Sequence, residues 1–207
     1  KGNGNYAYID NLMEAKKVFV SELGSTLFTI AKDVKVQIEF NPAQVKAYRL
    51  VGYENRILNK EDFNDDGKDA GELGAGHTVT ALYELVPAGS DESFGSVDDL
   101  KYQQATLVKS RDIMTVKLRY KQPDGEVSKL ITEVVSERDI AKIASANIRF
   151  ASAVAEFGML LRNSKYKEQA SYTAVLERAR DARGDDEFGY RAEFIRLVEI
   201  AQMLDKR

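Results

Sequence analysis

The chain has 207 residues, of which 43% are hydrophobic and 30% charged, and its formal net charge is −3. This length and composition suit one large domain or two small ones with an ordinary buried core. Basic residues do not cluster, so the sequence predicts neither a nucleic-acid groove nor docking on anionic lipid. Cysteine is absent, which excludes disulfides and thiolate zinc sites. No apolar run reaches membrane-spanning length, so no membrane insertion is expected in this segment.

The first segment, residues 1–24, is predicted to form a strand followed by a helix. The strand covers residues 5–9, and Asn11 caps a helix that starts at Leu12 and stops at Gly24. The chain opens KGNGNYAYID, without an initiator Met or a signal peptide, so we expect a piece of a longer protein. A strand and helix of this size cannot bury both apolar faces alone, and their packing partner is expected elsewhere.

The second segment, residues 25–137, is predicted to form an antiparallel β-sandwich. Alternation at 34–40 and 114–120 places apolar side chains on a core and charged side chains in water. Gly125 follows Pro and Asp in a turn, where it is expected to take a positive φ. Further strands are predicted at 45–53, 78–86, 105–109 and 129–135. The strand at 78–86 is apolar on both faces, which favours a central position.

The third segment, residues 138–207, is predicted to contain about three helices packed on the sandwich, so the fold class is α+β. Their expected buried faces are Phe150, Val154, Phe157 and Leu161; Tyr172, Val175, Leu176 and Ala179, after a cap at Ser171; and Phe194, Leu197, Ala201 and Leu204. The second helix also carries a mixed-sign patch, Glu177, Arg178, Arg180, Asp181 and Arg183. We interpret this patch as a solvated face with local ion pairs.

The acidic stretch at 62–72 is the candidate metal site, because its start has the spacing of an EF-hand calcium loop. The oxygen-bearing candidates are Asp62, Asn64, Asp66 and Glu72. The twelfth loop position, which should be a bidentate Glu, is Leu73, and a strand rather than a helix is predicted to follow. The alternatives are a calcium site of another geometry and a solvated loop whose Asn, Asp and Gly residues make turns. The turn-forming loop is the preferred interpretation.

Other candidates for chemistry are weaker. His77 could act with Glu72 in a hydrolase, but no nucleophile is near in sequence, and a turn into a strand is the simpler interpretation. The stretch at 91–96 imitates a D-x-S-x-S metal motif but follows loop residues and has Gly95 in place of the last Ser. No nucleophile elbow, Walker loop, zinc-protease helix or dinucleotide fingerprint is present. The sequence therefore predicts no catalytic residue, no cofactor and no enzyme activity.

Several stretches carry a resemblance to a known family. They are GNYAYIDNLMEAKKVFVSELG, TIAKDVKVQIEFNPAQVKAYRLVGYENR, DAGELGAGHTVTALYEL, FASAVAEFGMLLRNSKYK and GYRAEFIRLVEIAQ. Together they resemble the C-terminal region of bacterial von Willebrand factor type A domain proteins of the YfbK-like family. The resemblance implies that residues 1–24 are the last strand and helix of a type A domain, followed by a region of unknown function. The family's adhesion-site metal would lie upstream of Lys1, so none of its ligands is carried onto this chain.

The resemblance also implies a role. It implies a non-enzymatic accessory or interaction module of an extracytoplasmic type A domain protein, in the periplasm or cell envelope and often lipid-anchored. The implied partners are proteins, including the rest of its own type A domain. The alternative is a calcium- or ligand-binding module that uses the acidic loop at 62–72.

Overall fold

A computed structural model describes residues 7–52, 57–59, 61–91 and 110–205. The chain divides into two compact units, residues 1–139 and 140–207. The first holds all the described strands and a short helical segment, and the second is helical, so the α+β class predicted from the sequence is confirmed. The strand expected at 105–109 and all but the first residue of the 91–96 motif lie outside the described residues.

The N-terminal segment is helical but interrupted. It consists of α1 (Leu12–Lys16), a π-helical turn (Lys17–Ser21) and α2 (Leu23–Leu27). The predicted cap is confirmed, since the backbone N–H of Glu14 donates to Asn11 Oδ1 at 2.8 Å. A side-chain acceptor at this position satisfies one of the N–H groups that a helix start leaves without a partner.

Two expectations for this segment are wrong. Of the strand predicted at 5–9, residues 5 and 6 lie outside the described residues, and residues 7–9 form no strand, because no other described strand lies beside them and a single strand leaves its backbone polar groups unpaired. Gly24 lies inside α2 instead of ending a helix. The helix ends at Leu27, and the N–H of the capping residue Phe28 donates to the Gly24 carbonyl at 3.0 Å.

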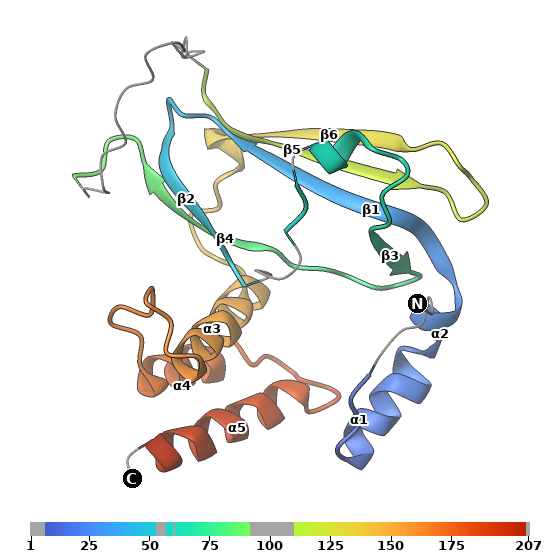
Figure 1. The fold of residues 1–207 in the computed structure, drawn as a ribbon. Coiled ribbons are helices and arrows are strands. Elements are labelled where there is room, and N and C mark those ends of the chain that lie inside the picture. Colours follow the sequence, from blue (N-terminus) through green and yellow to red (C-terminus); the bar gives the residue numbers. More distant parts are fainter. Residues whose placement is uncertain (1–6, 53–56, 60, 92–109, 206–207) are drawn as a thin grey trace. The chain divides into compact units, whose positions relative to one another are not determined.

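The described strands form two antiparallel sheets (Figure 1). One is four-stranded in the order β3-β1-β5-β6, and the other pairs β2 with β4. The strands are β1 (Thr29–Phe40), β2 (Val45–Val51), β3 (Gly71–Gly74), β4 (Leu82–Pro87), β5 (Asp112–Lys121) and β6 (Lys129–Ser136). The sheets meet at Phe40, whose ring centroid lies 4.3 Å from that of Tyr48 and 5.4 Å from that of Tyr83.

The tight connection from β1 to β2 carries the chain from one sheet to the other. Asn41 holds this turn: its Oδ1 accepts from the Ala43 N–H at 3.0 Å, and its Nδ2 donates to the Asp112 carbonyl at 2.7 Å. An Asn side chain that bonds to backbone groups two residues on replaces a backbone turn, which explains the abrupt change of direction.

Three details of the sheets differ from the predictions. The four-residue strand β3, with sequence GELG, was not predicted, because it has no apolar alternation. The strand predicted at 78–86 starts at Leu82 as β4 and pairs with β2, so among the described strands it belongs to a two-stranded sheet and is not central. Gly125 does not take a positive φ, because it is the last residue of its turn and donates to the Gln122 carbonyl at 2.9 Å.

The second unit consists of α3 (Ala146–Leu161), α4 (Tyr172–Asp181) and α5 (Tyr190–Asp205). Ser171 caps α4 as predicted, accepting from the Ala174 N–H at 3.2 Å. The buried core is made by Ala153, Val175, Leu176, Ala179, Ile195 and Val198, with Phe150, Phe157, Leu160, Tyr172 and Phe194 packed around it. Full burial of a side chain such as Val175 or Val198 contributes about 1.5–3 kcal/mol to folding.

The predicted buried face is confirmed for α4 but is wrong for part of α3 and α5. Val154 and Leu161 of α3 are exposed, and Ala153 and Leu160 contact the core instead. Leu197 and Leu204 of α5 are exposed in the same way, and its buried residues are Ile195 and Val198. Both helices carry more apolar positions than one face can bury, so periodicity alone could not choose between neighbouring stripes.

The mixed-sign patch on α4 connects helices instead of forming local pairs. Arg178 pairs with Glu156 of α3, and Arg180 pairs with Glu199 of α5. The prediction of a solvated face is therefore wrong in part, because charges on one helix are matched by charges on its neighbours. Among the described helices, none is long and apolar enough to cross a lipid bilayer.

Candidate functional site

The acidic loop lies against the charged face of the four-stranded sheet. It begins with a 3-10 turn, Glu61–Asn64, and runs on through Asp69. Phe63 is buried and anchors the turn. The residues at 65–68 make successive tight turns, with the Asp65 N–H donating to the Asp62 carbonyl at 3.3 Å. Because the Phe63 side chain is buried and the turns that follow are hydrogen-bonded, the directions of the backbone carbonyls of the loop are fixed.

Three basic side chains receive this loop: Lys35 on β1, and Arg119 and Lys121 on β5. We call them the cation cluster. Lys35 and Arg119 are opposite each other in the β1–β5 ladder, and Lys121 follows two residues after Arg119, so all three lie on one face of the sheet. Lys35 is 3% exposed and Lys121 is 6% exposed. Lysines are almost never buried to this extent without partners, because desolvating a charge is costly.

The partners come from the acidic loop. Lys35 Nζ donates to the Asp65 carbonyl, and Lys121 Nζ donates to the Asp66 carbonyl at 2.8 Å. Arg119 donates from Nη2 and Nε to the Asp66 carboxylate at 3.0 and 3.3 Å. The cation cluster therefore holds two consecutive residues of the loop through both backbone and side-chain oxygens.

A bulge in β1 supplies a further carboxylate. The β1–β5 register shifts between Lys32 and Lys35, and Asp33 there has a φ of +52°. Asp is among the few residues that take this left-handed conformation readily. Its Oδ2 lies 2.7 Å from Lys121 Nζ, and its Oδ1 accepts from the Ala70 N–H at 3.2 Å. Partial burial raises the pKa of Asp33, but the hydrogen bonds from Lys121 and Ala70 outweigh it and lower this pKa overall.

Asp66 has the largest shift in the site. The hydroxyl of Ser128 donates to its carboxylate, and with the guanidinium of Arg119 this lowers the pKa of Asp66 to about 2. The bond from Lys121 to Asp33 raises the pKa of Lys121. Both groups are therefore held in their charged forms across the physiological pH range.

The prediction that the charged face of 34–40 lies in water is wrong at Lys35, whereas the Glu39 side chain on the same face is 72% exposed. Lys35 is buried under the acidic loop, whereas Val36 on the opposite face is 52% exposed. The alternation of side chains is as predicted, but the pattern does not reveal which face another segment covers. The loop can cover a polar face because its carbonyls accept hydrogen bonds from the lysines there and the Asp66 carboxylate pairs with Arg119.

The candidate metal ligands do not converge. Asp62 accepts from Asn59 at 3.1 Å, and Asn64 lies 3.5 Å from Arg119. Glu72 accepts from the Thr29 hydroxyl at 3.5 Å, and Asp66 faces the cation cluster. Throughout the part of the chain that the structure describes, no three Asp, Glu or His side chains come together in a geometry that could hold a metal ion. The oxygens of the loop are matched instead by cationic side chains and hydrogen-bond donors of the protein itself.

His77 lies in a turn, as the simpler interpretation predicted. Its N–H donates to the Gly74 carbonyl at 3.1 Å, and Gly76 has a φ of +76°, a conformation that glycine adopts without steric cost. The His77 side chain is exposed. Glu72 bonds to Thr29, so the contacts of Glu72 give no support to a pair with His77.

The residues that organise this site could not be recognised from the sequence pattern. They are Asp33, Lys35, Arg119, Lys121 and Ser128. They lie between 30 and 62 positions from their partners in the acidic loop, so local spacing carried no signal. The usable signal was the row of basic residues on one face of two predicted strands, since a buried basic face requires an acidic segment to cover it.

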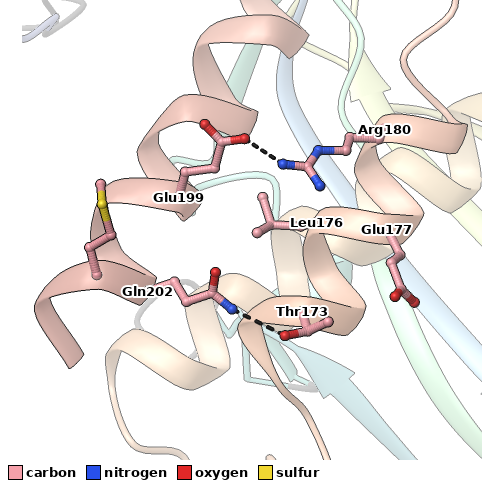
Figure 2. A pocket seen from close by; sticks show the side chains of 7 residues that line it. Thr173, Leu176, Glu177, Arg180, Glu199 and Gln202 are labelled. Carbon is pink, nitrogen blue, oxygen red and sulfur yellow. Dashed lines mark hydrogen bonds and ion pairs between the residues drawn. The ribbon is translucent and has the colours of Figure 1, made fainter. Parts of the chain in front are cut away.

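A second feature is an open groove between α4 and α5, with a volume of about 460 Å³. Leu176 points into it, and polar contacts cross it on both sides (Figure 2). Arg180 pairs with Glu199, and Gln202 Nε2 donates to Thr173 Oγ1 at 3.1 Å. These side chains satisfy one another across the groove. Their arrangement serves to hold the two helices together.

The observed fold defines the chain as an α+β module with a charge-neutralised acidic loop. A family model described as the C-terminal part of the uncharacterised protein YfbK matches residues 25–204, and the chain belongs to this family. The chain is 46% identical over 204 residues to the uncharacterised protein YfbK of Escherichia coli strain K12. The aligned region covers 97% of this chain but 35% of that relative, so the chain spans about a third of its length. No solved structure matches the chain.

The low pKa of Asp66 predicts how stability responds to acid. Its carboxylate is stabilised in the folded state, so the stabilisation is complete above its ordinary pKa of 3.8 and is lost as the pH falls through about 2. We expect Ser128→Ala and Arg119→Gln each to raise the pKa of Asp66 and to flatten the fall in stability between those two values. NMR titration of the Asp66 carboxyl carbon and urea unfolding at each pH measure the two effects. An unchanged Asp66 titration in both variants would contradict the assignment.

Proposed function

We propose that this chain is a non-enzymatic accessory module that completes and supports a von Willebrand factor type A domain in an extracytoplasmic protein. The observation that carries the proposal is the apolar surface of the N-terminal helical segment. Leu12, Phe19, Val20 and Leu23 are exposed, and Phe19 is 60% exposed although it is a large aromatic side chain. In a doubly wound fold, the last helix buries such side chains against a parallel sheet.

The family match is consistent with this division of the chain. It starts at residue 25, so α1 and the π-helical turn precede the matched region. The aligned part of the E. coli relative is 35% of its length, which leaves room for a separate domain in that protein. We assign residues 1–24 to the type A domain and residues 25–204 to the module that supports it and contacts a protein partner in the cell envelope.

A substitution at Phe19 tests the first half of the proposal. In a full-length protein that includes the type A domain, Phe19→Ser should lower the free energy of unfolding of that domain by about 3 kcal/mol, because a buried aromatic residue is lost. In the 207-residue chain, where Phe19 is exposed, the change should be within about 0.5 kcal/mol. Lys16→Ser, at an exposed polar position on the same segment, is the matched control. Equal small effects of Phe19→Ser in both proteins would refute the docking.

A deletion tests the second half. Affinity capture with the full-length protein is compared with capture by the same protein lacking residues 25–207. We expect at least one envelope protein to be recovered about tenfold less with the deleted form, because the module contributes binding area directly. Recovery of the same partners at the same strength by both forms would exclude a direct recruiting role.

The alternative function, calcium binding by the loop at 62–72, is tested separately. The cation cluster and hydrogen-bond donors already engage the oxygens of Asp62, Asn64 and Asp66, so a calcium ion would have to displace internal partners. We therefore expect millimolar calcium to produce no binding heat and no rise in the melting temperature, with magnesium as the matched control. A calcium-specific rise that Asp66→Asn abolishes would favour the alternative, since ligands that bind the folded state stabilise it by mass action.

A further inference from the structure

Strand β6 forms one edge of the four-stranded sheet. On its inner side it pairs with β5 from Lys129 to Ser136, and no described strand pairs with its outer side. Every second residue of an edge strand directs its N–H and C=O groups outward, where they can pair with another strand. The side chains of Leu130, Ile131 and Val134 are each about half exposed. In the part of the chain that the structure describes, this edge therefore combines backbone groups that have no strand partner with apolar side chains.

The usual protections of an edge are few here. The opposite edge, β3, has four residues and is bulged twice against β1, which leaves little backbone to pair. β6 has eight residues, contains no Pro, and pairs with β5 in regular register from Val135 to Lys129. At its C-terminal end the backbone N–H of Ser136 already has a partner, because the Asp139 carboxylate accepts from the N–H and the hydroxyl of Ser136. An incoming strand would therefore pair with the first part of β6.

Symmetry limits how β6 could pair with a second copy of itself. Residues directly opposite on antiparallel strands point to the same face of a sheet. A two-fold axis perpendicular to the sheet keeps the same face of both copies upward. A residue of one copy must then lie opposite a residue of the other copy whose number differs from its own by an even number. It follows that one residue, on the two-fold axis, lies opposite the same residue of the other copy.

Charge selects among these registers. With Ile131 facing itself, Lys129 of each copy lies opposite Glu133 of the other, which makes two ion pairs. If Thr132 lay on the axis, Ile131 of each copy would lie opposite Glu133 of the other, an apolar side chain against a charge. If Glu133 lay on the axis, the Glu133 carboxylates of the two copies would lie opposite each other, and like charges repel. Within the described residues, Lys129 and Glu133 take part in no ion pair, so both remain available.

We propose that β6 is a self-association edge, through which two copies of this chain join antiparallel with Ile131 on the two-fold axis. The contact joins two four-stranded sheets into one continuous sheet. The resulting dimer is a closed assembly, because each copy uses the same edge and no further copy can pair there. The register also places the exposed Val127, just before the strand, opposite Val135.

Charge reversal tests the register. Sedimentation velocity of the 207-residue chain, from about 1 to about 500 μM, should show a monomer–dimer equilibrium. Lys129→Glu and Glu133→Lys should each weaken dimerisation about tenfold or more, because each replaces two attractive pairs with two repulsive ones. The double variant Lys129→Glu/Glu133→Lys should restore the original dissociation constant. Lys142→Glu and Glu187→Lys, at exposed positions of the second unit, are controls with the same changes of net charge.

Hydrogen exchange supplies a measurement without substitution. Outward-facing amides of residues 129–133 should exchange more slowly at high than at low concentration. A chain that stays monomeric, a dimer insensitive to both single reversals, or a double variant that is not restored would each overturn the proposal. Concentration-dependent protection confined to another strand or helix would do the same. Unchanged circular dichroism of the variants shows that a loss of dimer is not a loss of folding.

Discussion

The buried lysines Lys35 and Lys121 impose the constraint on which the first unit depends. Neither charge could leave water without oxygen partners, and the partners they have are the carbonyls of Asp65 and Asp66 and the carboxylate of Asp33. The loop must therefore cross the sheet where it does, and β1 must bulge where it does. Breaking one of these contacts leaves a buried charge uncompensated, so the loop, the bulge and the sheet face form one electrostatic unit.

The second unit is stabilised in a different way. Its core is apolar, with Val175 and Val198 fully buried, and charges enter it at the margins, where they link neighbouring helices. Arg191 illustrates the arrangement. It donates to the Ala182 carbonyl at 2.7 Å and to Asn147 Oδ1 at 2.6 Å, and its guanidinium lies 4.8 Å from the Phe150 ring centroid. One side chain thus satisfies the end of α4 and fixes it to α3.

The sequence predicted those parts of the fold that depend on local pattern. Alternation identified β1 and β5, the turn that follows β5 identified β6 as its hairpin partner, helical periodicity identified α3 to α5, and the caps at Asn11 and Ser171 were placed correctly. The buried stripes of α3 and α5 and the covered face of β1 were not predicted, because they depend on which segment packs against them. The same reason applies to the acidic loop. Its carboxylates were visible in the sequence, but the cations that engage them lie on strands far away in the chain.

The two lysines of the cation cluster bind the loop through its backbone, and this affects which substitutions the loop can accept. Lys35 and Lys121 bind the carbonyl oxygens of Asp65 and Asp66, and every amino acid carries such an oxygen. Lys35 therefore recognises the path of the backbone at residue 65 rather than the identity of its side chain. Natural variants can change residue 65 and keep this bond, whereas a deletion that shortens the loop would move the carbonyl away. The bond from Lys35 therefore depends on the length of the loop more than on the side chain at residue 65.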